Sequence, residues 1–229
     1  MGVHDGHRRR LKDRFLEHGL ENFNDINALE LLLFFSIPRR DTNEIAHALL
    51  DRFGSLKAIF AASKRALMEV EGVGPSTAEL IMLVPQIMRR SEVIAAGEIK
   101  YATSTEAAGQ YLLPRFLYEE DEIFYMLCLN SQRRIICCIE LERGVVNEVR
   151  VNVRKLVETA LKYKASSVII AHNHPDGVAL PSAEDDVTTE QIFKALNAVG
   201  IALADHLVIA DGDFVSYRES DKFRRYVWK

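Results

Sequence analysis

The spacing of hydrophobic positions predicts different structures on the two sides of residue 100. Before that point, apolar residues recur at helical intervals, in segments that begin at capping residues. After it, short apolar runs typical of strands alternate with amphipathic segments typical of helices. The sequence therefore predicts an all-helical domain over residues 1–98 and a mixed α/β domain over 102–229, with a linker over 95–104.

Helical periodicity and capping residues define the segments of the N-terminal half. Asn27 and Ser63 are placed to cap helix N-termini, and Gly54 follows a segment end, where glycine is favoured. Pro75 suits the first position of a helix, because no backbone hydrogen bond is lost there. Pro85 lies inside the same segment and predicts a kink. The expected helices cover residues 25–37, 41–54, 55–63, 63–72 and 74–90.

The C-terminal half alternates between strand and helix patterns. The run SVIIA at 167–171 is apolar throughout, which is typical of a central strand that is buried on both faces. The segment 153–165 carries its apolar residues as a helical stripe. We expect strands over 122–130, 133–144, 145–152, 166–174, 201–212 and 213–220, and helices over 104–113, 153–165 and 182–200.

Composition places the chain among ordinary globular proteins. Hydrophobic residues make up 48% of its 229 residues, enough for a sizeable core, and the formal net charge is -4. This charge does not indicate a nucleic-acid-binding protein, although a local basic surface is compatible with it. The three cysteines lie in apolar runs outside any CxxC pair, as expected for reduced thiols. Without a signal sequence or a membrane-spanning apolar run, we expect a cytoplasmic protein with no membrane partner.

Two histidines leave the end of the apolar strand. His172 and His174 are two residues apart, so on an extended chain their side chains point to the same side. Two imidazoles on one side can share a zinc ion, which also accepts carboxylate oxygen. Because a catalytic zinc site uses three protein ligands and a water, we expect the following loop to bring back an acid. The alternative is a solvated histidine pair beside a polar loop.

Asp185 is the acid that best completes this set. Ser182 is placed as a helix N-cap, which makes Asp185 the third residue of that helix, at capping-box spacing. The backbone of Asp185 is thereby fixed a short loop away from the histidines. Glu184 and Asp186 flank it and should point elsewhere, whereas Asp176, next to the histidines, remains a rival ligand.

The motif and its surroundings resemble a known family. HNHPDGVALPSAED follows the pattern His-x-His-x7-Ser-x-x-Asp of the JAB/MPN metalloenzymes, called the JAMM motif. The stretches GVVNEV, AHNHPDG, DHLVIA and EGVGPSTAELI are most similar to bacterial RadC proteins, long named as DNA repair proteins. The resemblance covers nearly the whole chain. It implies an N-terminal helix-hairpin-helix-like domain and a C-terminal JAB/MPN domain of cytidine-deaminase-like α/β fold.

The resemblance also implies a cofactor and catalytic roles. It implies one zinc ion per chain, with Glu122 as the general base that holds the water and relays its proton to the leaving amine. Glu140, on the next strand, is the alternative base. The family serine that matches Ser182 stabilises the tetrahedral oxyanion. The capping pattern gives the same serine a structural role, and the sequence does not separate the two.

Two further polar residues, Asp205 and His206, precede the apolar stretch LVIA of a late strand. Either could hydrogen bond to a ligand histidine and orient its ring. They could equally form a buried polar pair that satisfies itself.

The segment VEGVGPSTAELI resembles a helix-hairpin-helix turn. Gly72 and Gly74 allow a tight turn, and the amides of the turn and of the helix start near Ser76 could hold a DNA phosphate. A compact turn used only for packing is the alternative. Glu71 and Glu79 would oppose phosphate binding. The densest basic cluster of this half comprises Arg8, Arg9, Arg10, Lys12 and Arg14.

The favoured hypothesis is a zinc-dependent JAMM-type metallohydrolase that cleaves an amide or isopeptide bond in a protein or peptide. The alternative is a DNA-binding protein of repair or recombination, whose JAMM domain acts on DNA-linked substrates or is inactive. The sequence identifies neither the substrate nor the oligomeric state.

Overall fold

The computed structural model describes residues 3–144, 151–175 and 177–220. Its contacts form two compact units, Met1–Met88 and Arg89–Lys229. The chain therefore combines an N-terminal helical region with a C-terminal α/β region, as the sequence predicted. Among the described residues, no helix is both long and apolar enough to cross a bilayer.

The division between the units falls inside a long helix, between Met88 and Arg89. The domain limits expected from the sequence, 1–98 and 102–229, remain a prediction. This helix begins at Pro75, as expected, and continues through Pro85 to Ala96, beyond the predicted end at residue 90.

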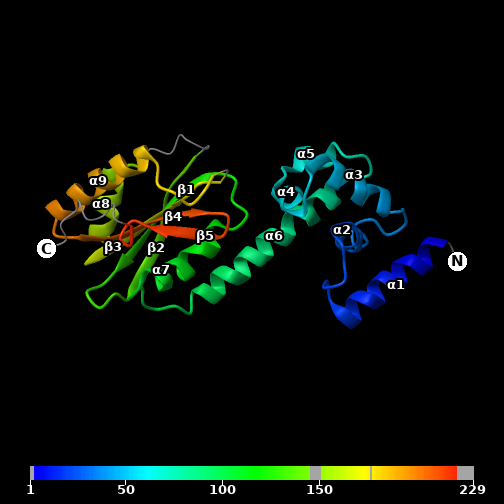
Figure 1. Cartoon of the computed structure of the whole chain (residues 1–229), viewed down its shortest axis with the longest axis horizontal. Helices are drawn as coiled ribbons and strands as arrows, with labels where there is room; N and C mark the ends of the chain where they lie inside the picture. Colours follow the sequence, from blue (N-terminus) through cyan, green and yellow to red (C-terminus); the bar gives the residue numbers. More distant parts are fainter. Residues whose placement is uncertain (1–2, 145–150, 176, 221–229) are drawn as a thin grey trace. The chain divides into compact units, whose positions relative to one another are not determined.

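Helices build the first unit (Figure 1). Their apolar faces meet in one core, in which Leu33, Leu49, Ile59 and Ile81 are fully buried. Burial of such side chains contributes about 1.5–3 kcal/mol each, so this core stabilises the packing of the helices. The helices are α1 (Val3–His18), α2 (Asp25–Leu33), α3 (Asn43–Phe53), α4 (Leu56–Ala61), α5 (Lys64–Met68) and α6 (Pro75–Ala96).

Capping residues set most of these helix ends. Thr42 and Gly54 bound α3, with Gly54 in the left-handed region at φ 81°, and Ser63 caps α5 through its side chain. The N-cap of α2 is Asn24, so the prediction of Asn27 was wrong. The side chain of Asn24 accepts a hydrogen bond of 2.8 Å from the Asn27 amide, so the helix begins at Asp25, the first residue of the predicted range.

The second unit contains a five-stranded mixed sheet in the order β2-β1-β3-β4-β5. β3 and β4 are parallel, and the other neighbours are antiparallel. The predicted strand over 145–152 falls mostly on residues outside the described ones, and Asn152 caps α8 instead. The strands are β1 (Glu122–Leu129), β2 (Ile135–Gly144), β3 (Ser167–Asn173), β4 (Ala202–Ala210) and β5 (Asp213–Ser216).

Helices cover both faces of this sheet (Figure 1). α8 (Val153–Lys162) and α9 (Ala183–Ala198) pack on one face, and α7 (Thr105–Leu112) with the short 3-10 helix Leu113–Phe116 packs on the other. Every residue of β3 is buried, which confirms the expected central strand. Because β3 and β4 are parallel, α9 must cross between them, and its N-terminus lies near the end of β3.

The turn between α5 and α6 depends on Gly72, which has φ 88°. A Cβ added there would lie 2.7 Å from Cδ1 of Ile45, a core residue of α3. The neighbouring Gly74 does not have a positive φ, and a Cβ added there would have no atom within 4 Å. Glycine is therefore required at the first of these two positions only.

We expect Gly72→Ala to destabilise the helical unit by about 2 kcal/mol, because the change adds a strained φ and a contact with Ile45. The matched control Gly74→Ala should change the free energy of unfolding by under about 1 kcal/mol. Urea denaturation followed by circular dichroism measures both. Equal effects of the two substitutions would contradict this account of the turn.

Candidate metal centre

Three side chains that are predicted ligands converge at the end of β3. His172 is the penultimate residue of that strand, His174 follows it, and Asp185 lies in the first turn of α9. The Nε2 atoms of the histidines are 3.0 Å apart. Oδ1 of Asp185 lies 3.0 Å from Nε2 of His172, and Oδ2 lies 3.3 Å from Nε2 of His174. One ion could therefore contact all three residues.

A capping box holds Asp185 in place. The Ser182 hydroxyl accepts a hydrogen bond from the Asp185 amide at 3.1 Å. In return, one oxygen of the Asp185 carboxylate accepts from both the amide and the hydroxyl of Ser182, at 2.7 Å each. The carboxylate is thus fixed at the helix start, where the helix dipole also favours negative charge.

The outer nitrogen of each histidine shows which ring nitrogen carries the proton. Nδ1 of His174 lies 3.2 Å from the carbonyl oxygen of Val178, which can only accept. A neutral His174 therefore carries its proton on Nδ1 and presents a lone pair from Nε2 toward Asp185. For His172, the position of the proton depends on His206, because Nδ1 of His172 lies 2.8 Å from Nε2 of His206.

Thr189 determines which ring nitrogen of His206 carries the proton. The single hydroxyl proton of Thr189 goes to the carbonyl oxygen of Asp185, at 2.6 Å. The same hydroxyl must then accept from Nδ1 of His206, 2.7 Å away, which leaves Nε2 of His206 as an acceptor for His172. Complete burial, with the nearby His172, lowers the pKa of His206 well below its ordinary value and keeps it neutral. This chain of bonds directs the lone pair of His172 Nε2 toward Asp185.

Aromatic neighbours hold the two buried rings. The ring of Phe124 stacks on His172 with centroids 6.0 Å apart, and Tyr217 stacks on His206 at 4.7 Å. The rings therefore have little freedom to turn away from the positions that the hydrogen bonds give them.

The ligand atoms of the centre carry lone pairs and a negative charge but few protons. Burial alone would raise the pKa of Asp185, but its interactions with His172, His174 and Ser182, which favour the charged carboxylate, outweigh burial and hold that pKa far below its usual range. The hydrogen bond with Asp185 raises the pKa of His174 against partial burial, which lowers it. An anionic carboxylate facing two imidazole lone pairs requires a cation, either a proton or a metal ion.

The donor set fits zinc. Two imidazole nitrogens and one carboxylate oxygen are typical zinc ligands, and atoms bound to a tetrahedral zinc ion are about 3.3 Å from one another. The side chain of His172 is only 2% exposed, whereas that of His174 is 23% exposed. One side of the site is therefore accessible to a water or a substrate.

The acids that compete with Asp185 as the third ligand are Glu184, Asp186 and Asp176. Glu184 is exposed, and Asp186 accepts a hydrogen bond of 2.9 Å from the Tyr217 hydroxyl, on a different side of α9. Asp176 lies outside the described residues.

Glu122 is the first residue of β1, on the same face of the sheet as the histidines. β1 pairs with β3 so that Phe124 is opposite His172, and continuing this register places Glu122 opposite residue 174. The charge of Glu122 contributes to the raised pKa of His174, after the larger effect of Asp185. The register and this electrostatic effect both place Glu122 on the side of β1 that faces the centre.

Glu140, the alternative base, has a different environment. It is opposite Tyr125, the residue after Phe124, and so lies on the other face of the sheet. Arg143 holds it in an ion pair at 2.9 Å, and this hydrogen bond lowers the pKa of Glu140 against the effect of burial. The Tyr125 hydroxyl donates a further bond to it.

Asp205 is separated from the metal ligands. Its carboxylate accepts from the hydroxyls of Thr105 and Ser216 and from the amides of His206 and Arg218. These bonds join α7, β4 and the turn after β5. Burial raises the pKa of Asp205, but its four donors satisfy the carboxylate without any histidine ring.

Sequence reasoning missed two residues at this centre. Thr189 lies one helical turn after Asp185, a spacing that could have indicated it. Asn173 lies between the two histidines and clamps the start of β1: its Oδ1 accepts from the Ile123 amide at 2.8 Å, and its Nδ2 donates to the Asp121 carbonyl at 3.0 Å. These two bonds flank Glu122 on both sides.

Comparisons with known proteins agree with this architecture. Residues 102–222 match the family model of the RadC-like JAB domain, and residues 42–84 match a SAM-like helix-hairpin-helix tandem. A UPF0758 protein of Saccharophagus degradans is 31% identical over 210 residues, which cover 92% of this chain and 94% of that protein. A UPF0758 protein of Methylibium petroleiphilum is 35% identical over 92% of this chain and 95% of its own length. The chain belongs to the family of RadC-like JAB domain proteins that carry an N-terminal helix-hairpin-helix region.

Proposed function

We propose that the protein is a zinc-dependent hydrolase that cleaves an amide or isopeptide bond in a protein or peptide. The observation that carries this proposal is the convergence of His172, His174 and Asp185, with both imidazole lone pairs directed at the carboxylate. The family supports it, because JAB domains are generally hydrolytic.

The three ligands would hold one zinc ion per chain. When bound, zinc supplies Lewis acidity, which polarises a carbonyl and lowers the pKa of a coordinated water to about 7. His174 and Asp185 are partly exposed, so a water or a substrate could reach the site from their side.

Glu122 is the proposed general base. A carboxylate on the same face as the histidines can take a proton from a water and pass it to the leaving amine. Asn173 bonds to the backbone on both sides of Glu122, so the backbone of this residue is held beside the ligands by the sheet.

Ser182 is proposed to stabilise the oxyanion, but its hydroxyl proton is already directed at Oδ2 of Asp185. Donation to a substrate oxygen requires that the hydroxyl rotates away from the carboxylate. Binding of a cation by Asp185 would weaken its bond to Ser182 and favour this rotation.

Exposed aliphatic side chains border the centre and favour a polypeptide substrate. Val178, whose carbonyl orients His174, is 65% exposed, and Leu180 on the same loop is 62% exposed. Val187, two residues after Asp185, is 56% exposed. Such side chains can pack against a peptide, whereas a nucleic acid would be expected to meet basic residues.

DNA binding by the helical unit is the second candidate function. The match to a helix-hairpin-helix tandem at 42–84 and the left-handed Gly72 favour it. The proposed DNA contact remains the turn between α5 and α6, which contains Gly72 and Gly74, together with Ser76 at the start of α6.

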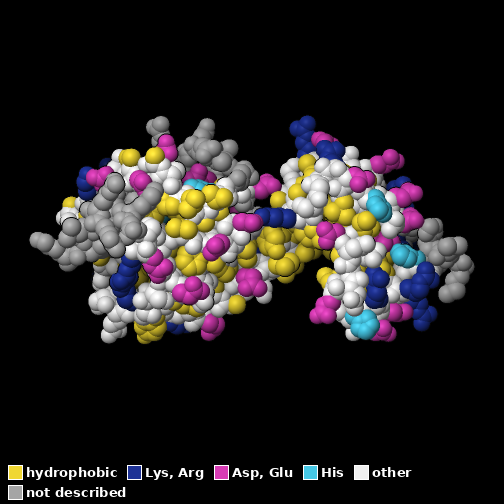
Figure 2. Space-filling view, in the orientation of Figure 1, with side chains coloured by type: hydrophobic (Ala, Val, Ile, Leu, Met, Phe, Trp, Pro, Cys, Tyr) yellow, Lys and Arg dark blue, Asp and Glu magenta, His cyan; other side chains and the backbone are white. Residues whose placement is uncertain are grey.

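The charges near the hairpin oppose this candidate. Lys64 pairs with Glu79 at 2.7 Å, and Glu69 pairs with Arg52 and Arg65. Figure 2 shows basic and acidic side chains interspersed on the visible face of this unit.

The basic residues of α1 are mostly engaged in packing. Arg8 donates to the carbonyl oxygens of residues 37 and 40 and stacks on Phe34, while Arg14 stacks on Phe23. Lys12 lies over Phe35. These cations hold α1 against its neighbours, which limits their availability to a phosphate.

We expect Glu122→Gln to retain zinc but lower hydrolysis by about 100-fold or more, because the proton acceptor is lost. His174→Ala should lose the zinc itself. Elemental analysis measures the metal, and fluorogenic peptides and isopeptide-linked conjugates measure hydrolysis. The control Glu184→Gln removes an exposed acid of α9 and should change neither the zinc content nor the rate of hydrolysis. A purified protein that takes up no zinc, or a His174→Ala variant that binds zinc as the wild type does, would refute the site.

Thr189→Val should weaken zinc binding by about 10- to 100-fold, because His206 loses the acceptor that fixes its tautomer and so no longer orients His172. Competition with a chromophoric chelator measures the affinity. Thr188→Val is the control at the adjacent helix position. If both variants bind zinc equally well, the bonds through His206 do not orient the ligand.

If the hairpin contacts DNA, Glu79→Gln should strengthen binding by about two- to tenfold at low salt, because it frees Lys64 and removes a repelling charge. This increase in DNA affinity should become smaller as the salt concentration rises. Fluorescence anisotropy with single-stranded and branched DNA measures this, with the exposed Glu21→Gln as control. Equal affinities for both variants and the wild type would exclude the hairpin as a DNA contact.

A further inference from the structure

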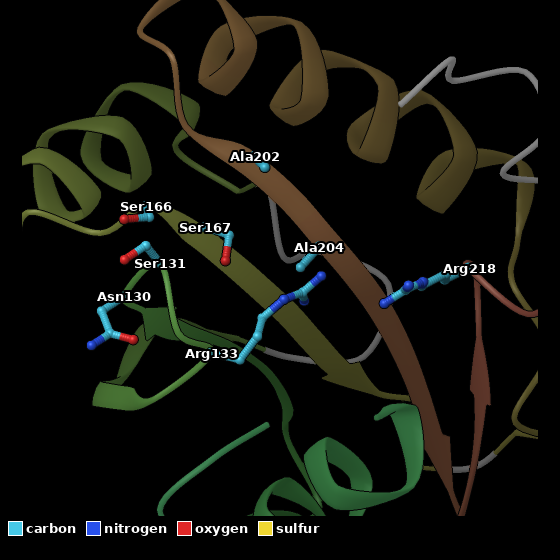
Figure 3. Close-up of a pocket in the computed structure, with 8 residues that line it drawn as sticks. All are labelled: Asn130, Ser131, Arg133, Ser166, Ser167, Ala202, Ala204 and Arg218. Carbon is cyan, nitrogen blue, oxygen red and sulfur yellow. The ribbon is translucent and has the colours of Figure 1, made fainter. Parts of the chain in front are cut away.

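A cavity of about 470 Å³ lies at the end of the sheet opposite the candidate metal centre. Its floor consists of small side chains, Ala202 and Ala204 of β4 beside Ser167 of β3 (Figure 3). Ala204 is a bulge residue, since Val168 is opposite Leu203 while Ile169 is opposite Asp205. The extra residue and the missing side-chain volume together leave the space open.

Two arginines point into this cavity from different parts of the chain. Arg133 belongs to the turn between β1 and β2, and Arg218 follows β5 (Figure 3). Among the described residues, neither guanidinium takes part in an ion pair or a side-chain hydrogen bond. The remaining walls formed by described residues are polar and carry no acid, with contributions from Asn130, Ser131 and Ser166.

The nearest buried acid is directed elsewhere. Asp205 follows Ala204 directly, but its carboxylate accepts bonds from Thr105 and Ser216 and does not line the cavity. The cavity therefore presents two positive charges and several hydroxyl donors, in a chain whose formal net charge is -4.

The backbone at Arg133 has a conformation that arginine does not favour. Arg133 has φ 63°, in the left-handed region that glycine adopts without strain. Its turn is already closed by Asn130, whose side chain accepts from the amides of Gln132 and Arg134 at 2.9 Å each. Arginine is thus the less favourable residue for this turn, yet its guanidinium is free to bind a ligand.

We propose that this cavity binds a phosphate monoester of a small molecule. Two guanidinium groups match a dianion, and the planar fork of each can donate two hydrogen bonds to phosphate oxygens. A single carboxylate would leave one fork unmatched. The volume is that of a small-molecule site, so it holds a phosphate together with an organic group.

This site is independent of the proposed hydrolytic centre. Ser167 and His172 are five positions apart on β3, which corresponds to about 17 Å along the strand. No proposed metal ligand lines the cavity.

Isothermal titration calorimetry of the full chain, with EDTA present to exclude binding to metal, tests the proposal. The probes are inorganic phosphate, adenosine 5′-monophosphate and a single-stranded oligonucleotide without terminal phosphates. We expect saturable binding of the monophosphate, weaker binding of inorganic phosphate, and none of the oligonucleotide. Binding of the oligonucleotide alone would assign the cavity to nucleic-acid backbone and overturn the proposal.

Arg133→Gly separates binding from folding. It should weaken monophosphate binding by about tenfold or more, because charge-assisted hydrogen bonds are lost. The melting temperature should stay the same or rise slightly, since glycine suits the turn. Arg218→Gln should weaken binding similarly, whereas the adjacent Arg134→Gln should not. No binding to the wild type at millimolar monophosphate, or equal binding by Arg133→Gly, would refute the site.

Discussion

The parallel pairing of β3 with β4 is the constraint on which the second unit depends. Parallel neighbours cannot be joined by a tight turn, so the chain must leave β3, form α9 and return. The departure carries His172 and His174, and the start of α9 carries Asp185, so the crossover itself brings the ligands together. At the other end of the same two strands, the bulge at Ala204 forms the floor of the arginine-lined cavity. One pairing thus determines both polar sites.

Buried hydrogen bonding then gives the candidate metal centre its chemical character. A fully buried histidine is costly unless both ring nitrogens have partners, and His206 finds them in Thr189 and His172. Each bond in this series has only one compatible direction, because it ends on a carbonyl oxygen. The direction of one hydroxyl proton therefore decides that Nε2 of His172, which faces Asp185, carries no proton. Such a network is stable only when every member is satisfied.

Local sequence signals predicted the architecture and several details of the site. The motif around His172, His174 and Asp185 joins two local structures, a strand end and a capped helix start, and both have strong sequence patterns. The N-cap of α2 was misplaced because asparagines at 24 and 27 satisfy the same local rule. Asn173 bonds to a strand that is distant in the sequence, which gives no local pattern, and only the folded chain shows its partners. The cavity is likewise assembled from distant segments.

The middle residue of the His-Asn-His sequence has a mechanical consequence. Successive residues of a strand face opposite ways, so Asn173 reaches the backbone of β1 while its two neighbours face the candidate metal centre. Any displacement of the end of β3 must carry Glu122 with it. The backbone of Glu122 and that of the two histidines would consequently shift together when either strand end moves.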